Sequence, residues 1–181
     1  MLPGISTEQL RSRLNRMVAD GLLTRQRYRE VPPRVDYELT ERSKDLMPVL
    51  GALARWGYSW TWSSPKAGEE INIGAIFRLA PGLLAPAPGL RGTIEIAVQP
   101  GDGQGPEIYV LTAADGVVTV SERPAEAPDA RVSGSVDAWV RALGPETDSS
   151  ELEYSGARDL GETMIAGFAD AAATTRAVAA A

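Results

Sequence analysis

Apolar residues recur with a helical period near the start of the chain. They stand at positions i, i+4, i+7 and i+8, which gathers them on one face of a helix: Leu10, Leu14, Met17 and Val18. Ser6 followed by Gln9 is a capping-box start, because each side chain can bind the other residue's unpaired backbone N–H. Gly21 is the residue that most easily takes the left-handed conformation that ends a helix. The pattern therefore predicts a helix between Ser6 and Gly21.

The other side of this predicted helix is polar and basic. Side chains of this kind can reach phosphates and the base edges in a major groove of DNA. The candidate DNA-binding residues of this segment are Ser6, Thr7, Arg11, Arg13, Asn15 and Arg16. The alternative is a solvated amphipathic helix, which is the more common meaning of a charged helix face taken alone.

A predicted β-hairpin follows after a two-residue pause. Residues 22–28 form a strand candidate, 29–34 hold two prolines that cannot donate to a ladder, and 35–39 alternate apolar and polar. A helix followed by a basic hairpin is the order of a winged helix-turn-helix, whose helix enters the major groove. The hairpin would lie along the DNA backbone, with phosphate contacts from Arg25, Arg27, Arg29 and Arg34.

This N-terminal stretch closely resembles the HxlR-type winged-helix transcriptional regulators. The resemblance is carried by Gly4-Ile-Ser, Leu10, Arg13-Leu14, Asp20-Gly-Leu, Val31-Pro-Pro-Arg-Val-Asp-Tyr-Glu-Leu-Thr40 and Leu50-Gly-Ala-Leu-Ala-Arg-Trp-Gly57. The run from Val31 to Thr40 is its most specific part. The resemblance implies further helices ahead of the recognition helix, whereas Met1 stands almost at its start. Either the true start lies upstream or the chain is shortened, and a shortened form would bind DNA weakly or not at all.

A second helix is predicted after Thr40, which serves as its N-cap. Pro48 predicts a kink or a late start, and Gly57 is the expected end. Its apolar residues could be plain core, but a winged helix on a two-fold-symmetric operator needs a dimer, and the resembled family pairs this helix. The predicted homodimer interface contains Leu50, Leu53 and Trp56.

Composition changes near residue 60 and predicts two domains. Residues 1–60 carry ten basic and seven acidic side chains (+3), and residues 61–181 carry eight and seventeen (−9). The first part could bind nucleic acid and the second would repel it. We predict a winged helix-turn-helix at 1–59 that lacks its upstream helices, a linker at 60–68 and a ligand-binding domain at 69–181.

The second part predicts strands followed by helices. An apolar run at 71–79 is interpreted as a helix. Strands are predicted at 92–98, 107–112, 116–121, 130–133 and 152–155, with an Asp-Gly hairpin before the third. Ser135 and Asp159 are candidate helix caps, and the last helix runs into an alanine-rich tail. The fold class is therefore α+β: a partial winged helix-turn-helix, then an antiparallel sheet with packed helices.

Residues 69–175 are similar in their order of elements to sterol-carrier-protein domains. The similarity rests on the hairpin, Asp129-Ala-Arg-Val, the helix with Trp139, and Tyr154-Ser-Gly-Ala-Arg-Asp-Leu160. It implies a cavity for a small apolar ligand between sheet and helices. The candidate ligand-binding residues are Phe77, Ile94, Ile96, Tyr109, Leu111, Trp139, Met164 and Phe168. For each of them ordinary core is the more common role, because pockets and cores use the same residue types.

The chain has no Cys and no His, which removes disulfides, thiol chemistry, the usual zinc and iron sites and catalytic triads. We predict no cofactor, no metal site and no membrane span, and a cytoplasmic location. The carboxylate pairs Glu69-Glu70 and Glu151/Glu153 have no metal-ligand companions and are interpreted as solvated surface, so no enzyme activity is predicted.

Two functions remain open from the sequence. The first is a homodimeric regulator that binds double-stranded DNA and whose acidic domain binds a small apolar effector. The alternative is a small-molecule or lipid-like carrier with a vestigial N-terminal segment that no longer binds DNA.

Overall fold

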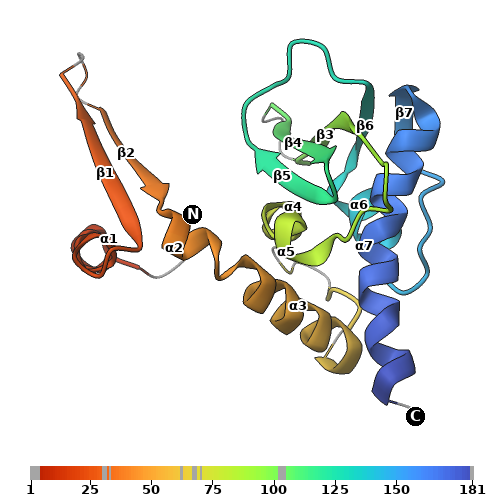
Figure 1. The fold of residues 1–181 in the computed structure, drawn as a ribbon, viewed down its shortest axis with the longest axis horizontal. Coiled ribbons are helices and arrows are strands. Elements are labelled where there is room, and N and C mark those ends of the chain that lie inside the picture. The colour runs from red at the N-terminus through yellow and green to blue at the C-terminus, as the bar shows by residue number, and fades with distance from the viewer. Residues whose placement is uncertain are drawn as a thin grey trace. The chain divides into compact units, whose positions relative to one another are not determined.

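The computed structural model describes residues 5–29, 32, 34–61, 63–66, 69, 71–101 and 105–179. The chain divides into two compact units, Met1–Met47 and Pro48–Ala181 (Figure 1). Both contain helices and strands, so the α+β class predicted from the sequence is confirmed. The domain limits predicted at residues 59 and 69 stay predictions.

The first unit begins with helix α1, Thr7–Ala19, whose ends form as the sequence predicts. Ser6 Oγ accepts the Gln9 N–H, and Gln9 Oε1 accepts the Ser6 N–H, each at 3.2 Å. At the other end Gly21 has φ +71°, which allows Gly21 N–H and Leu22 N–H to reach the carbonyls of Val18 and Met17. This Schellman arrangement satisfies two carbonyls at the helix end and turns the chain into the hairpin.

Strands β1, Leu23–Tyr28, and β2, Arg34–Leu39, pair antiparallel from Leu23↔Leu39 to Tyr28↔Arg34. The hairpin is therefore confirmed, although Glu30, Val31 and Pro33 of its tip lie outside the described residues. Helix α2, Glu41–Lys44, follows with Thr40 as its N-cap. Among the described residues of this unit, the buried ones are Leu23 and Ser43, so its core is very small.

Helix α3, Met47–Thr61, starts where a late start was predicted but runs past its predicted end. The helix capped by Thr40 stops at Lys44, and α3 starts anew with Pro48 in its first turn, where a missing N–H breaks no helical hydrogen bond. The predicted late start at Pro48 is thus correct. The predicted end at Gly57 is wrong, because Gly57 lies inside the helix, which continues through Tyr58 and Trp60.

The second unit contains a five-stranded sheet of order β5-β4-β3-β6-β7. Its strands are β3 Gly92–Gln99, β4 Glu107–Ala114, β5 Val117–Ser121, β6 Ala130–Ser135 and β7 Glu153–Gly156. Asp115 and Gly116, with φ +52° and +78°, make the predicted two-residue hairpin turn between β4 and β5. The predicted antiparallel sheet is corrected to a mixed one, because β3 and β6 pair in parallel. After β5 the chain crosses to the far side of β3, and such a crossover gives parallel neighbours.

Four helices cover the sheet face that carries Ile94, Ile96 and Val98 (Figure 1). They are α4 Gly74–Arg78, α5 Ala80–Leu83, α6 Val136–Leu143 and α7 Arg158–Ala179. The helix predicted at 71–79 is shorter than expected. Ser135 caps α6 through the Ala138 N–H as predicted, whereas Asp159 lies within the first turn of α7 rather than at its cap.

Candidate functional site

The polar residues of α1 are all solvent-exposed but do not share one narrow face. Arg11, Arg13, Asn15 and Arg16 are exposed, as are Ser6 and Thr7 at the helix start. At about 100° per residue, Arg11 and Arg13 lie about 200° apart, one on each side of the apolar stripe. Arg16 Nε is 3.7 Å from the Asp20 carboxylate in a solvated pair. The helix therefore offers a broad basic arc rather than a single line of cations.

The hairpin places its arginines on two faces. Arg25 is opposite Tyr37 and Arg27 is opposite Val35, so both cations lie on one face of the ribbon. The Arg25 guanidinium lies 5.9 Å from the centre of the Tyr37 ring, a favourable cation–π distance. Neither arginine forms a salt bridge with a carboxylate of the described residues. Both are thus placed to meet an anion.

Arg34 lies on the other face of the ribbon, opposite Tyr28. Its Nε and one terminal nitrogen each donate to the Asp36 carboxylate at 2.8 Å, a bidentate arrangement. Its guanidinium also lies 5.6 Å from the Tyr28 ring centre. Arg29 follows β1 and is exposed. The four hairpin arginines named from the sequence are therefore not equivalent, because Arg34 already has an anionic partner.

The apolar face of α1 is only partly covered in this structure, with Leu14 and Val18 half-buried. No residue of the helix is buried, and Leu10 and Met17 are 39% and 36% exposed. Val35 and Leu39 of β2 are similarly exposed, at 40% and 43%. The first unit therefore presents apolar surface that its own described residues do not bury.

Helix α3 carries an uncovered apolar face, which we call the α3 stripe. Helical geometry places one group of large side chains together and away from the face that contacts the rest of the second unit. These are Val49, Leu53, Trp56 and Trp60, at 62%, 61%, 53% and 64% exposure, with Leu50 on its flank at 42%. The three residues predicted as a dimer interface, Leu50, Leu53 and Trp56, are thus all available for contact with another molecule.

The predicted ligand-binding residues form the packed core of the second unit. All eight are at most 6% exposed, and the Phe77 ring is 5.0–5.8 Å from the rings of Tyr109, Trp139 and Phe168. The Trp139 indole N–H donates to the Ala97 carbonyl at 3.3 Å, so it is already occupied. Of the eight, Phe168 and Met164 each also line a surface hollow. Their role as ligand contacts stays a prediction.

Tyr109 ends in a network of charges beside the core. Its hydroxyl donates to Glu107 at 2.6 Å, and the Arg78 guanidinium lies 5.2 Å from its ring centre. Burial, and secondarily the bond to Glu107, raises the pKa of Tyr109 to about 12. Arg78 also binds Glu122 at 2.7 and 3.0 Å, which lowers the pKa of the Glu122 carboxyl. These groups satisfy one another, which is what a structural network requires.

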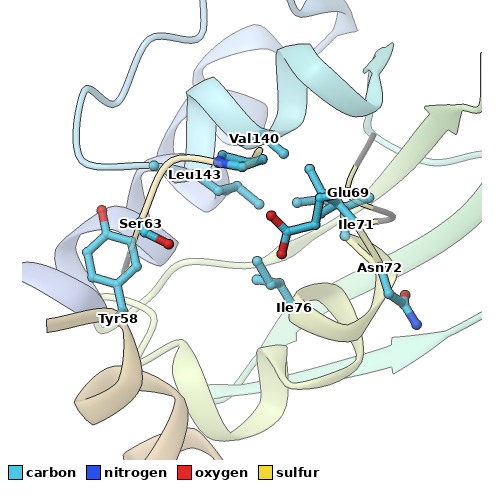
Figure 2. A pocket seen from close by; sticks show the side chains of 11 residues that line it. Tyr58, Ser63, Glu69, Ile71, Asn72, Ile76, Val140 and Leu143 are labelled. Carbon is cyan, nitrogen blue, oxygen red and sulfur yellow. The ribbon is translucent and has the colours of Figure 1, made fainter. Parts of the chain in front are cut away.

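A cavity of about 340 Å³ lies outside that core, within the second unit (Figure 2). Most of its lining is apolar, and Glu69, Asn72 and Ser63 supply side-chain polar groups. Tyr58 of α3 and Leu143 of α6 form walls on two sides. We call this space the α3–α6 cavity. The sequence did not predict this lining, because residues 60–68 were interpreted as a linker, Glu69 as solvated surface and the run at 71–79 as a helix.

The remaining carboxylate pairs show no catalytic arrangement among the described residues. Glu151 is paired with Arg141, and Glu153 lies 3.5 Å from the Ser133 hydroxyl. Glu70 lies outside the described residues. In the part of the chain that the structure describes, no three His, Cys, Asp or Glu residues are grouped to hold a metal ion, and no helix is long and apolar enough to cross a membrane.

Comparison with known proteins identifies the N-terminal segment. Residues 1–65 match the family described as HxlR-like helix-turn-helix, which confirms the interpretation of this segment from its sequence. An uncharacterized HTH-type transcriptional regulator of Methanothermobacter thermautotrophicus is 39% identical over 69 residues, which are 38% of this chain and 53% of the relative. The chain spans about half the length of the curated relatives it matches.

Two solved structures are similar to portions of this chain. The redox regulator HypR in its oxidized form is 35% identical, with 35% of this chain and 65% of that chain covered and a TM-score of 0.32. The sterol carrier protein domain 2 of Helicoverpa armigera is 17% identical, with 62% of this chain and 96% of that chain covered and a TM-score of 0.43.

Proposed function

We propose that this chain is a cytoplasmic transcriptional regulator that binds double-stranded DNA as a homodimer. Helix α1 enters the major groove, and the β1–β2 hairpin lies along the phosphates. The second unit binds a small apolar molecule that alters the affinity for DNA. The observation that carries the proposal is the HxlR-like match of residues 1–65, together with two exposed arginines, Arg25 and Arg27, on one face of the hairpin.

The distribution of charge and apolar surface supports this proposal. Residues 1–60 have a net charge of +3 and residues 61–181 of −9, so attraction to DNA is concentrated in the first part. The α3 stripe supplies an apolar surface of the kind that pairs helices in a homodimer. A two-fold dimer would present two copies of α1 to two half-sites one helical turn apart.

The proposal is tested by fluorescence polarisation on DNA that flanks the chain's own gene, over a series of salt concentrations. Affinity should fall steeply with salt, because each phosphate contact contributes a slope of about 0.9 in log–log units. Arg25→Ala and Arg27→Ala should each reduce the slope by about 0.9. Arg123→Ala, which removes a cation from the second unit, is the matched control and should leave the slope unchanged. An affinity independent of salt refutes the phosphate contacts.

One observation favours a second candidate, a small-molecule or lipid-like carrier whose N-terminal segment no longer binds DNA. No residue of α1 is buried, which leaves the predicted recognition helix weakly anchored in the described structure. Mass spectrometry of the purified, folded chain separates the two candidates. A co-purifying apolar molecule combined with no DNA binding at any salt concentration supports the carrier, whereas salt-dependent binding to the flanking DNA supports the regulator.

A further inference from the structure

The α3–α6 cavity has an apolar interior and an acidic mouth. Ile76, Val140 and Leu143 are partly or fully buried and form its walls. Glu69 is solvent-exposed at its edge, and Figure 2 shows its carboxylate directed into the space between Ile76 and Tyr58. A volume of about 340 Å³ is at the lower end of the range of small-molecule sites.

A smaller hollow of about 80 Å³ continues this cavity along α3. It is lined by Ala54 and Arg55 of α3, with Leu83 and Phe168 on the far side. Tyr58, Ile76 and Leu143 line both spaces, so the two adjoin one another. A ligand in the α3–α6 cavity would therefore lie next to a second hollow along α3.

The Glu69 carboxylate has one bonding partner in the part of the chain that the structure describes. Its Oε2 accepts the backbone N–H of Lys66 at 3.0 Å, and no described cation lies within salt-bridge distance of it. Asn72 does not supply a charge, and its amide oxygen accepts the Ala75 N–H at 3.2 Å. A carboxylate beside apolar walls is desolvated without compensation when an apolar body fills the cavity, unless the ligand brings a cation.

We infer that the α3–α6 cavity binds an amphipathic cation, with an ammonium group at Glu69 and an apolar chain against Ile76, Val140 and Leu143. This inference rests on the proposed function, because it names the site and the ligand class for the second unit. The net charge of −9 on residues 61–181 acts in the same direction, since it attracts cations and repels fatty-acid-like anions over longer distances. The eight buried residues that the sequence predicted as ligand contacts then serve as the scaffold behind the site.

The same geometry connects the ligand to α3. Tyr58 is a wall of the cavity, and Gly51 and Arg55 of the same helix contact Gly82 of α5. An apolar chain under Tyr58 adds contacts between α3 and the rest of the second unit. Occupation of the cavity therefore stabilises the position of the helix whose opposite face is the α3 stripe.

The test compares three probes that share one alkyl chain: decylammonium, decanol and decanoate. Each is titrated calorimetrically, below its micelle concentration, into the full chain and its variants. Decylammonium should bind most tightly, and Glu69→Gln should weaken it about tenfold while leaving decanol unchanged, because only the charge-assisted interaction is lost. Glu126→Gln, at an exposed loop carboxylate of the same unit, is the control and should change neither.

A second variant keeps the test decisive if the charge change alters folding. Val140→Phe fills the cavity from the half-buried α6 side and should weaken decylammonium and decanol alike, by at least about tenfold. Two results would overturn the cation site. One is that Glu69→Gln binds decylammonium as tightly as wild type, and the other is that decanoate binds as tightly as decylammonium.

The outcomes separate this inference from the proposed function. Because the titration needs no DNA, loss of DNA binding refutes the regulator without affecting the ligand result. If Val140→Phe weakens the binding of the probes but Glu69→Gln does not, the cavity is still a ligand site. That result overturns only the inference that its ligand is a cation. Failure of all three probes to bind overturns the cavity as a site and removes the ligand-binding half of the proposed function.

Discussion

Gly51 of α3 lies so close to Gly82 of α5 that a Cβ atom on Gly51 would overlap the Gly82 carbonyl group. Gly51 is also the buried residue of α3. One turn further along, Arg55 donates to the same Gly82 carbonyl at 3.0 Å. Helices α3 and α5 are thus joined at a backbone-to-backbone contact, which is possible because Gly51 has no side chain.

Gly51→Ala should therefore destabilise the second unit. The new methyl group forces α3 away from α5, and overpacking of this kind costs about 1–3 kcal/mol. The expected result is a lower midpoint of denaturant-induced unfolding, measured by the helical signal in circular dichroism. The free energy of unfolding should fall even though alanine has the higher helix propensity.

Gly57→Ala is the matched control on the same helix. Among the described residues, a Cβ there meets the Thr61 hydroxyl oxygen at 3.7 Å, an ordinary van der Waals distance. Replacing a helical glycine with alanine should then stabilise the chain by about 0.5–1 kcal/mol. If both variants shift the midpoint in the same direction, the Gly51–Gly82 contact does not hold α3.

These two glycines also show why the end of α3 was mispredicted. A glycine after an apolar run ends many helices, because it tolerates the left-handed conformation. Gly21 does so, with φ +71°. Gly57 remains helical and Gly51 is used for close packing, and nothing in the local sequence distinguishes these three roles. Tertiary contact decides between them.

A charge placed in the α3 stripe should dissociate the proposed homodimer. Leu53→Asp would put a carboxylate at a position that is 61% exposed in the single chain and would be buried in the proposed pair. Desolvation of an unpaired charge costs several kcal/mol, so the dimer dissociation constant should rise by at least about a hundredfold. Sedimentation velocity over a range of concentrations measures it.

Val117→Asp is the control for this experiment, because Val117 is 58% exposed on β5, outside the stripe. It should leave the sedimentation coefficient unchanged. A wild-type chain that sediments as a monomer at all concentrations would contradict the proposed homodimer.

The raised pKa of Tyr109 gives a stability prediction at alkaline pH. The pKa is about 12 in the folded chain against 10.0 for an ordinary tyrosine, so the folded state holds the proton more tightly than the unfolded state. The resulting stability is complete below about pH 10 and is lost as pH rises through about 12, by at most about 1.4 kcal/mol per pH unit. Denaturant unfolding of wild type and Tyr109→Phe across this range measures the difference. In Tyr109→Phe the free energy of unfolding should lack this part of the decline with pH. If it falls with pH as steeply as in wild type, the raised pKa of Tyr109 is contradicted.

The sequence was sufficient for local features and insufficient for the cavity. Caps at Ser6, Thr40 and Ser135 and the Asp115-Gly116 turn are decided by neighbouring residues, and all four formed as predicted. Parallel pairing of β3 with β6 depends on a crossover between distant residues, which no local pattern encodes. The α3–α6 cavity likewise combines segments from residue 58 to residue 144. Its polar member Glu69 looked like ordinary surface in the sequence.

The hairpin offers the last prediction, which concerns Asp36. Its carboxylate holds Arg34 by two hydrogen bonds on the ribbon face opposite Arg25 and Arg27. In the proposed complex this carboxylate repels phosphates and competes with them for Arg34. Asp36→Asn should therefore strengthen DNA binding and steepen the salt dependence by about 0.9 log units per decade, because one more cation can meet a phosphate. Adding Arg34→Ala should remove that gain.

Asp45→Asn changes the net charge of the same unit equally and controls for the long-range field, so its slope should match wild type. An unchanged slope in Asp36→Asn would mean that Arg34 stays away from the DNA and that the phosphate-facing side of the hairpin is the Arg25 and Arg27 face alone.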